Sequence, residues 1–110
     1  MTNYRPLVTV NIMCYEIHTT EIFNKWLKNI KDKITHFRID ARLTRLTEGN
    51  FGDAKSVSNN LFELRFTFGG GIRIYYTIQG ERIILLLHGG NKSTQSKDIE
   101  KAKKIIEELS

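Results

Sequence analysis

Two neighbouring segments carry arginine and tyrosine on one side of a strand-like alternation. In Leu61–Phe68 apolar residues alternate with polar ones, and Ile72–Ile78 repeats the pattern after the run Gly69-Gly70-Gly71. Glycine adopts the positive φ angles that a chain reversal needs, so the two segments are predicted to form a β-hairpin. The hairpin face opposite its apolar side chains collects Arg65, Arg73 and Tyr75.

The chemistry of that face depends on what lies between the two guanidinium groups. Like charges side by side on a sheet repel each other unless an anion lies between them. A phosphodiester is well suited, because guanidinium donors form paired hydrogen bonds with phosphate oxygens. The alternative is that Glu63 and other acids neutralise the arginines as ordinary surface ion pairs. The alternation fits both interpretations.

A lysine follows the next predicted strand. Ile83–Leu87 is apolar at every position, as a central strand is, and Lys92 comes shortly after it, behind Gly89-Gly90. The segment lacks the GxxxxGK[ST] spacing of a phosphate-binding loop. Lys92 is instead expected to place an ammonium group beside the basic hairpin. A helix starting near Ser93 would add partial positive charge there.

Other side chains with catalytic chemistry are isolated in the sequence. His88 is a candidate general acid or base, but a histidine at a strand end is more often a packing or hydrogen-bonding residue. The three histidines, with His18 and His36, are too scattered for a metal site, and none is predicted. The single cysteine, Cys14, lies in a strand pattern and is expected to be an inert, buried thiol.

Two helices are predicted in the N-terminal half, after a strand-like segment, Leu7–Ile17. Thr19-Thr20-Glu21 favours a helix start, and an apolar face follows at helical spacing. The second helix is predicted from Asp32 to Thr47, ending near Gly49. Its two apolar rows are Ile34, Phe37 and Ala41 on one side and Ile39, Leu43 and Leu46 on the other.

The two rows cannot both face one sheet, so one is expected to contact the sheet and the other the first helix or a partner. Between the rows runs a basic stripe, which fits either a solvated helix face or an RNA-facing surface. The stripe consists of Lys31, Arg38, Arg42 and Arg45.

The C-terminal half is predicted to hold strands and one last helix. Asp53–Ser58 is a candidate short strand before the turn at Asn59-Asn60. The last helix is expected to start at Ser93 or Ser96, and its apolar face is Ile99, Ala102, Ile105, Ile106 and Leu109.

The composition fits one domain, residues 1–110, with a formal net charge of +5. Such an excess is compatible with a nucleic acid or an acidic protein as partner, without establishing either. The longest apolar run is too short to span a membrane, and the first residues have no secretion signal. With a single cysteine, these features predict a cytoplasmic protein without a membrane partner.

Several segments together resemble one toxin superfamily. They are Phe23-x-x-Trp26-Leu27, Ala41-Arg42-Leu43-x-Arg45-Leu46, Gly49-Asn50-Phe51-Gly52-Asp53-x-Lys55-x-Val57, Glu63-Leu64-Arg65, Gly71-Ile72-Arg73-Ile74-Tyr75-Tyr76 and Leu85–Ala102. In this order they make the chain, from about Cys14 to Ile106, similar to the addiction module killer protein branch of the RelE/HigB toxins, which includes phage-derived relatives.

The resemblance implies an α+β, RelE-like fold, in which a twisted, mainly antiparallel sheet is backed by two N-terminal helices and a C-terminal helix. It also implies cleavage of mRNA, typically in the ribosomal decoding site. The partner it implies is a cognate antitoxin, commonly a helix-turn-helix protein, in an oligomeric toxin–antitoxin complex. By matching position the functional residues are Arg65, Arg73 and Lys92, with Tyr75 or Tyr76 and Gln95 as further candidates.

The chain departs from the usual pattern at a few positions. Ile72 stands where relatives usually have an aromatic residue, and alternation puts it on the core face. Asn91 stands where they often have aspartate, which removes a possible partner of Lys92. Residues 1–13 exceed the usual start, so they are either an N-terminal extension or precede a natural start at Met13.

The resulting hypothesis is metal-independent cleavage of mRNA without a cofactor, in which the 2′-hydroxyl attacks the adjacent phosphorus. Arg65 and Arg73 suit stabilisation of the phosphoryl charge, while Lys92 or Tyr75 could move protons if the basic cluster lowers its pKa. The residues expected to bind RNA are Arg38, Arg42, Arg45, Lys55 and Gln95. The alternatives are an inactive RNA- or protein-binding module and a toxin of the same fold with another target.

Overall fold

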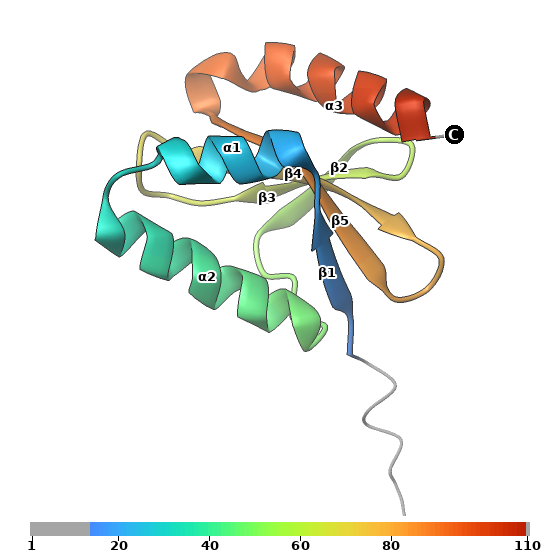
Figure 1. Ribbon diagram of the computed structural model, residues 1–110, viewed down its shortest axis with the longest axis horizontal. Coiled ribbons are helices and arrows are strands. Elements are labelled where there is room, and N and C mark those ends of the chain that lie inside the picture. The colour runs from blue at the N-terminus through green and yellow to red at the C-terminus, as the bar shows by residue number, and fades with distance from the viewer. Residues whose placement is uncertain (1–13, 110) are drawn as a thin grey trace, which may run out of the picture.

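The computed structural model describes residues 14–109, which form one five-stranded sheet with helices on both of its faces (Figure 1). The elements are β1 (Glu16–Thr19), α1 (Glu21–Asn29), α2 (Lys33–Thr47), β2 (Ala54–Ser58), β3 (Leu61–Arg65), β4 (Ile72–Gln79), β5 (Ile83–Asn91), the 3₁₀ turn η2 (Lys92–Thr94) and α3 (Gln95–Leu109).

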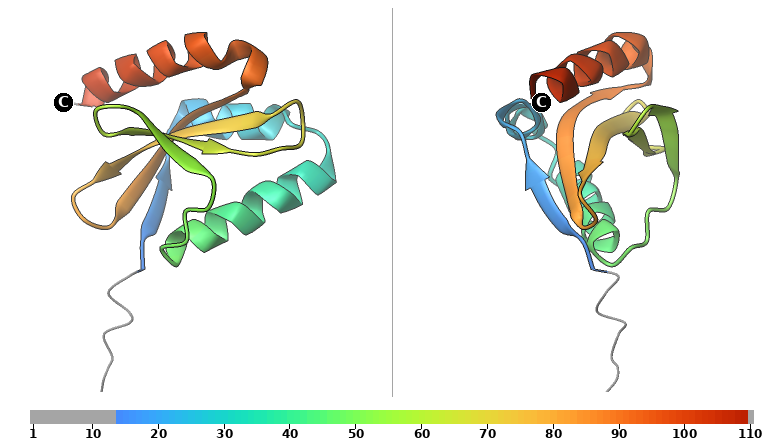
Figure 2. Two further views of the ribbon diagram at one scale, coloured as in Figure 1. Left: turned by 180° about the vertical axis from the view of Figure 1, so that it is seen from behind. Right: turned by 90° about the vertical axis from the view of Figure 1, so that its right-hand side faces the viewer.

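The sheet has the strand order β1-β5-β4-β3-β2. β1 runs parallel to β5, and every other neighbouring pair is antiparallel. α1 and α2 cover one face and α3 covers the other, as the two rotated views show (Figure 2). The predicted α+β fold is therefore confirmed, with its twisted, mainly antiparallel sheet, two N-terminal helices and one C-terminal helix.

The alternation along the strands divides the core into two parts. On the α1/α2 side, Leu64, Ile74 and Leu86 pack with Phe23 and Ile39. The other part lies under α3, where Leu85 and Leu87 pack with Ala102 and Ile105. Since β5 contributes to both parts, its apolar residues are buried on both faces, as the sequence predicts for a central strand.

The helix boundaries follow from capping side chains. Thr20 caps α1, accepting a hydrogen bond from the backbone N–H of Phe23 at 3.0 Å. Asp32 caps α2 in the same way through Thr35. Gly49, with φ of +84°, lies just past the end of α2. Both N-terminal helices thus match their predictions closely.

Only one apolar row of α2 is buried. Ile39 and Leu46 are fully buried against the sheet, whereas Ile34 is 62% and Phe37 73% exposed. Of the two alternatives for the second row, contact with α1 is therefore wrong, and the Phe37 row is an exposed apolar surface that leaves the alternative of a partner.

Three expectations near the ends of the chain have different outcomes. Residues 1–13, including most of the predicted strand Leu7–Ile17 and the alternative start at Met13, lie outside. Cys14 precedes β1 and is exposed, so the expected burial of its thiol is wrong. α3 begins at Gln95, between the two expected starts at Ser93 and Ser96, and it follows η2, which Asn91 caps.

Candidate functional site

Three neighbouring strands bring Arg65, Arg73 and Lys92 together. Arg65 on β3 pairs in register with Arg73 on β4, and Arg73 pairs with Gly90 on β5, two residues before Lys92. A Cβ atom placed on Gly71 would lie 3.2 Å from Cβ of Lys92 and 3.4 Å from Nη1 of Arg73. The juxtaposition predicted from alternation is thus present in the structure.

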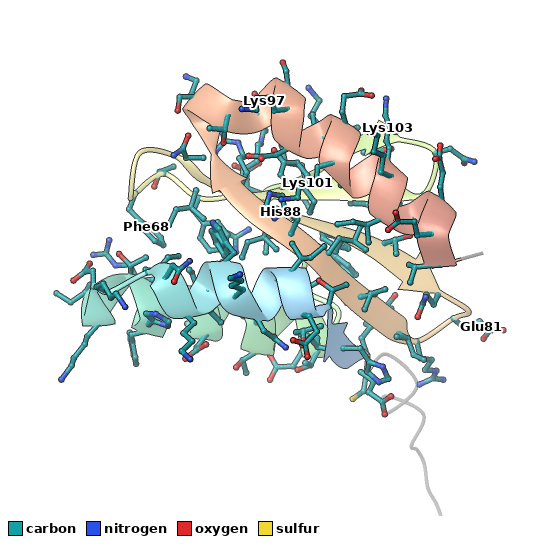
Figure 3. The ribbon with its side chains drawn as sticks, turned by 45° about the horizontal axis from the view of Figure 1, so that its top comes forward. Phe68, Glu81, His88, Lys97, Lys101 and Lys103 are labelled. Carbon is teal, nitrogen blue, oxygen red and sulfur yellow. The ribbon has the colours of Figure 1, made fainter. Side chains whose placement is uncertain are left out.

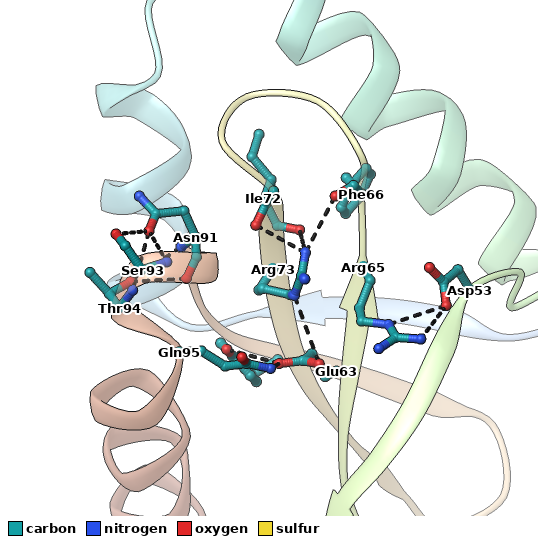
Figure 4. Close-up of polar contacts among 12 residues, drawn as sticks. Asp53, Glu63, Arg65, Phe66, Ile72, Arg73, Asn91, Ser93, Thr94 and Gln95 are labelled. Carbon is teal, nitrogen blue, oxygen red and sulfur yellow. Dashed lines mark hydrogen bonds and ion pairs between the residues drawn. The ribbon is translucent and has the colours of Figure 1, made fainter.

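Arg65 is paired with Asp53. Its Nε and Nη2 donate to Asp53 Oδ1 at 3.2 and 3.0 Å (Figure 4). Both side chains are substantially exposed, 37% for Arg65 and 52% for Asp53. An ion pair at such exposure contributes little to stability, so a phosphate can replace the carboxylate at small cost.

Arg73 is held by the hairpin itself. Its Nη1 donates to the carbonyl oxygens of Gly71 at 3.0 Å, Ile72 at 3.2 Å and Phe66 at 3.3 Å. Its Nε lies 3.8 Å from Oε1 of Glu63 (Figure 4). The guanidinium group is therefore fixed in place before any ligand arrives, and only 12% of the side chain is exposed.

A buried carboxylate lies behind Arg73. Glu63 is fully buried, and its Oε2 accepts hydrogen bonds from Tyr75 Oη at 3.2 Å and from Gln95 Nε2 at 2.6 Å. Within residues 14–109, neither Glu63 Oε1 nor Arg73 Nε has a hydrogen-bond partner. Glu63 thus balances the charge of Arg73, which is the role that the alternative interpretation gave it.

Tyr75 is placed differently from the expectation. The sequence suggests an open face, but α3 covers this part of the sheet and leaves Tyr75 fully buried. Burial and the adjacent Glu63 carboxylate raise the pKa of Tyr75. The shift is opposite to the one that proton transfer at neutral pH requires. Tyr76 faces the other part of the core, where burial raises its pKa to about 12.

Lys92 is exposed at the start of η2. The preceding Asn91 caps this turn, since its Oδ1 accepts hydrogen bonds from the backbone N–H groups of Ser93 at 2.9 Å and Thr94 at 3.2 Å (Figure 4). Asparagine is among the preferred capping residues, as aspartate is. The departure at Asn91 therefore keeps the backbone that positions Lys92. Ile72, the other departure, is a buried core residue as predicted.

His88 has a partner that sequence reasoning did not find. Its Nε2 lies 3.2 Å from Oδ1 of Asp98 on α3, and Thr94 Oγ1 hydrogen-bonds to the other carboxylate oxygen. Burial lowers the pKa of His88, and the hydrogen bond with Asp98 opposes that shift in part. Figure 3 shows His88 on β5 beneath α3. Periodicity gives no signal for this contact, because it depends on where α3 packs on the sheet.

The basic stripe of α2 divides into structural and exposed members. Arg42 Nη1 donates to the carbonyl oxygen of Arg65 at 2.8 Å, and its guanidinium carbon lies 4.6 Å from the centre of the Phe66 ring. Arg38 lies over Phe68 at 5.1 Å. Arg38, Arg45 and Lys31 are exposed.

The two remaining candidates lie on either side of Glu63. Lys55 is exposed on the edge strand β2 and pairs in register with Glu63. Gln95, by contrast, is partly buried and donates its amide to the Glu63 carboxylate. Lys55 can therefore contact a ligand directly, whereas Gln95 is engaged within the protein.

Comparison with known proteins assigns the chain to a family. The sequence profile of the family described as "Phage derived protein Gp49-like" matches residues 21–109. The chain belongs to this Gp49-like family. An uncharacterized protein of Haemophilus influenzae is 46% identical over 97 residues, covering 88% of this chain and 98% of the relative.

A solved structure shares the fold at low sequence identity. It is a free-state mutant of the Escherichia coli toxin RelE, with a TM-score of 0.62 and 12% identity, covering 80% of this chain and 97% of RelE. The likeness establishes a RelE-like fold.

Residues 14–109 contain neither a membrane-spanning helix nor a cluster of metal-ligand side chains. No helix there combines the length and the hydrophobicity that crossing a membrane requires. In the same residues, no three His, Cys, Asp or Glu side chains gather as metal ligands do.

Proposed function

We propose that the chain is the toxin of a toxin–antitoxin pair and that it cleaves mRNA on the ribosome, which stops translation. The observation that supports this most is the cluster of Arg65, Arg73 and Lys92 across three adjacent strands. The Gp49-like family and the RelE-like fold agree with it. Such a target requires the protein to act in the cytoplasm, with a cognate antitoxin, commonly a helix-turn-helix protein, keeping it silent in an oligomeric complex.

The proposed reaction is metal-independent and needs no cofactor. The 2′-hydroxyl loses its proton to solvent water, and its oxygen forms a bond to phosphorus while the bond to the 5′-oxygen breaks. The products are a 2′,3′-cyclic phosphate and, once the departing oxygen is protonated, a 5′-hydroxyl. Arg65 and Arg73 donate hydrogen bonds to the phosphoryl oxygens, on which negative charge grows. Because the hairpin fixes Arg73 in advance, little reorganisation accompanies that step.

The proton transfers involve Lys92 in this proposal. It is exposed beside Arg73, and its ammonium group can donate a proton to the departing 5′-oxygen. Tyr75 acts instead as a positioning residue. It is buried, and its raised pKa keeps the phenol protonated, so that it goes on donating its hydrogen bond to Glu63.

One observation favours a second candidate, an RNA-binding module that does not cleave. Of the side chains around the cluster, Tyr75 has a raised pKa and His88 is held under α3 by Asp98. Neither Tyr75 nor His88 is therefore placed to act as the general base at the cluster. Phosphate contacts alone supply affinity for RNA without any cleavage.

Induced expression of Arg73→Ala, with 5′ ends of cellular mRNA mapped, tests the proposal. The wild type is expected to arrest growth and create new 5′ ends, and Arg73→Ala to lose both effects. Arg82→Ala is the matched control, since Arg82 lies before β5, at the opposite end from Lys92. Because Arg73→Ala removes the charge that balances the buried Glu63, circular dichroism must show that both variants stay folded at the growth temperature.

The outcomes separate the two candidates. New 5′ ends with Arg73→Ala would contradict the role of the cluster. Growth arrest by the wild type without new 5′ ends would favour the binding module. If a helix-turn-helix gene lies beside this one, release of arrest by co-expression of its product would identify the antitoxin.

A further inference from the structure

A groove of about 360 Å³ runs between α2 and the end of the β3–β4 hairpin. We call it the α2 groove. It lies apart from the Glu63–Tyr75 pair but shares Arg65 with the basic cluster. Its lining from α2 is Phe37, Arg38, Ala41, Arg42 and Arg45, and its lining from the hairpin side is Asp53, Arg65, Phe66, Thr67 and Phe68.

The groove combines an exposed aromatic ring with positive charge. Phe37 is 73% exposed, the most exposed of the large apolar side chains in the described structure. Beside it Arg38 lies over the ring of Phe68, 5.1 Å from its centre. Flat rings flanked by guanidinium groups are the arrangement on which unpaired nucleobases stack while their phosphates are neutralised.

The charge of the lining favours a polyanion. Four arginines face one acidic residue, Asp53, which already pairs with Arg65. Arg42 is committed to the carbonyl of Arg65, so Arg38 and Arg45 are the members available to phosphates. A purely apolar protein segment would bury these charges without compensation, which is unfavourable.

The position of Arg65 links the groove to the proposed site of cleavage. Its backbone carbonyl accepts a hydrogen bond from Arg42, so Arg65 belongs to the groove lining, and its side chain belongs to the basic cluster. A strand whose phosphate contacts Arg65 therefore has a neighbouring nucleotide within reach of the groove.

We infer that the α2 groove binds the single-stranded RNA segment next to the phosphate held by Arg65, with a base stacked on Phe37 and phosphates contacted by Arg38 and Arg45. The inference rests on the proposed function only in placing that phosphate at the basic cluster. It adds a base-stacking subsite to a site otherwise made of cations.

The test uses a fluorescein-labelled, single-stranded 2′-O-methyl oligonucleotide, which cannot be cleaved because it has no free 2′-hydroxyl. Its affinity for the full chain is measured by fluorescence anisotropy. Phe37→Ala is expected to weaken binding about 5- to 100-fold, the range of one base–aromatic stack. Phe37→Tyr keeps a flat ring and is expected to bind within about 2-fold of the wild type. Ile22→Ala, which removes a 38%-exposed apolar side chain from α1, is the control and is expected to change nothing.

An oligonucleotide with one abasic position identifies stacking directly. A series of oligonucleotides carries the abasic position at successive places in the strand. One of them is expected to bind the wild type more weakly than the intact oligonucleotide does. The same one is expected to bind Phe37→Ala as well as the intact oligonucleotide does. The inference is overturned if Phe37→Ala binds the oligonucleotide as tightly as the wild type does, or if the wild type shows no measurable binding to it. It is also overturned if Phe37→Ala binds the oligonucleotide normally but no longer binds the antitoxin.

These outcomes are distinct from failure of the proposed function. If the wild type binds through Phe37 but leaves an unmodified oligonucleotide and cellular mRNA intact, the subsite stands and the ribonuclease does not. If mRNA is cleaved and Phe37→Ala cleaves and binds as the wild type does, only the subsite fails.

Discussion

The buried Glu63 carboxylate is the residue on which the basic cluster depends. It receives hydrogen bonds from Tyr75 and Gln95 on one oxygen and faces Arg73 with the other. A buried charge without such partners would be strongly unfavourable, so Tyr75 and Gln95 make an acid possible at this position. Glu63 in turn balances the charge of the Arg73 guanidinium group, which in the proposed function holds a phosphate.

Replacing Tyr75 with phenylalanine tests its positioning role. Tyr75→Phe keeps the packing under α3 but removes one donor from the buried carboxylate. The free energy of unfolding, measured in urea, is expected to fall by about 1–3 kcal/mol. The pH profile of RNA cleavage is expected to keep its shape, since Tyr75 moves no proton. A lost ionisation in that profile, without any loss of stability, would instead identify Tyr75 as a proton donor.

His88 gives the protein a stability that depends on pH. Burial under α3 lowers its pKa in the folded chain below the ordinary value of about 6.5, and the charged groups that act on it are Asp98 and Lys101. Between the folded and the unfolded pKa the unfolded chain binds more protons, so stability falls as the pH drops below about 6.5. Above that range the imidazole is neutral in both states and contributes no pH dependence.

The variant His88→Gln isolates this effect. The free energy of unfolding of the wild type minus that of the variant is expected to be flat from pH 7 to 8 and to decrease as the pH falls from 6.5 to 5. Chemical denaturation at a series of pH values measures it, and groups common to both proteins cancel in the difference. An increase of that difference toward low pH would mean that the folded chain favours the imidazolium.

At the scale of elements, two adjacent glycines let β5 pass between α1 and α3. A Cβ on Gly89 would lie 2.4 Å from the Trp26 ring of α1, and one on Gly90 would lie 1.9 Å from the Asp98 carboxylate of α3. Successive residues of a strand point to opposite faces, so one helix packs closely on each glycine. This close packing fixes the start of α3, and with it Gln95 and η2.

A double-mutant cycle tests whether Gly90 is required by Asp98. Gly90→Ala is expected to destabilise the chain by about 1–3 kcal/mol through overpacking. In an Asp98→Ala background the cost is expected to be smaller, because the colliding carboxylate is gone. Gly89→Ala is the matched control, since its collision with Trp26 is unaffected by Asp98→Ala. Equal costs of Gly90→Ala in both backgrounds, measured by urea unfolding, would contradict the proposed contact.

Elements with strong local signals are those that the sequence predicts well. The spacing of Ile39 and Leu46 and the caps at Thr20 and Asp32 are local properties, and they predict α1 and α2 nearly to the residue. The alternation that pairs Arg65 with Arg73 is equally local. Where α3 packs is not local, because it depends on the path of the chain after β5. The burial of Tyr75 and the His88–Asp98 contact could therefore not be predicted from periodicity.

At the scale of the whole molecule, the positions of the basic side chains matter more than the net charge. The formal charge of +5 is modest, but Arg65, Arg73 and Lys92 lie where β3 ends, β4 begins and β5 leads into η2. Arg38 and Arg45 of α2 line the groove at the same end. Arg82 lies before β5, at the opposite end of that strand from Lys92. At about 3.3 Å per residue the strand separates the two by about 30 Å. Figure 3 likewise shows Glu81 and Phe68 at opposite ends of the molecule.

The salt dependence of RNA binding tests whether affinity depends on where the basic side chains lie or only on the net charge of the protein. Each phosphate contact with single-stranded RNA contributes about 0.7 to the slope of log affinity against log salt concentration. Arg38→Gln and Arg45→Gln are therefore each expected to reduce that slope by about 0.7, measured by anisotropy with the 2′-O-methyl oligonucleotide. Arg82→Gln removes the same charge at the far end and is expected to leave the slope unchanged. Arg42→Gln is expected to lower the melting temperature as well, because Arg42 joins α2 to the carbonyl of Arg65. Equal slopes for the variants of Arg38, Arg45 and Arg82 would show that the protein attracts RNA by its overall charge and not through the α2 groove.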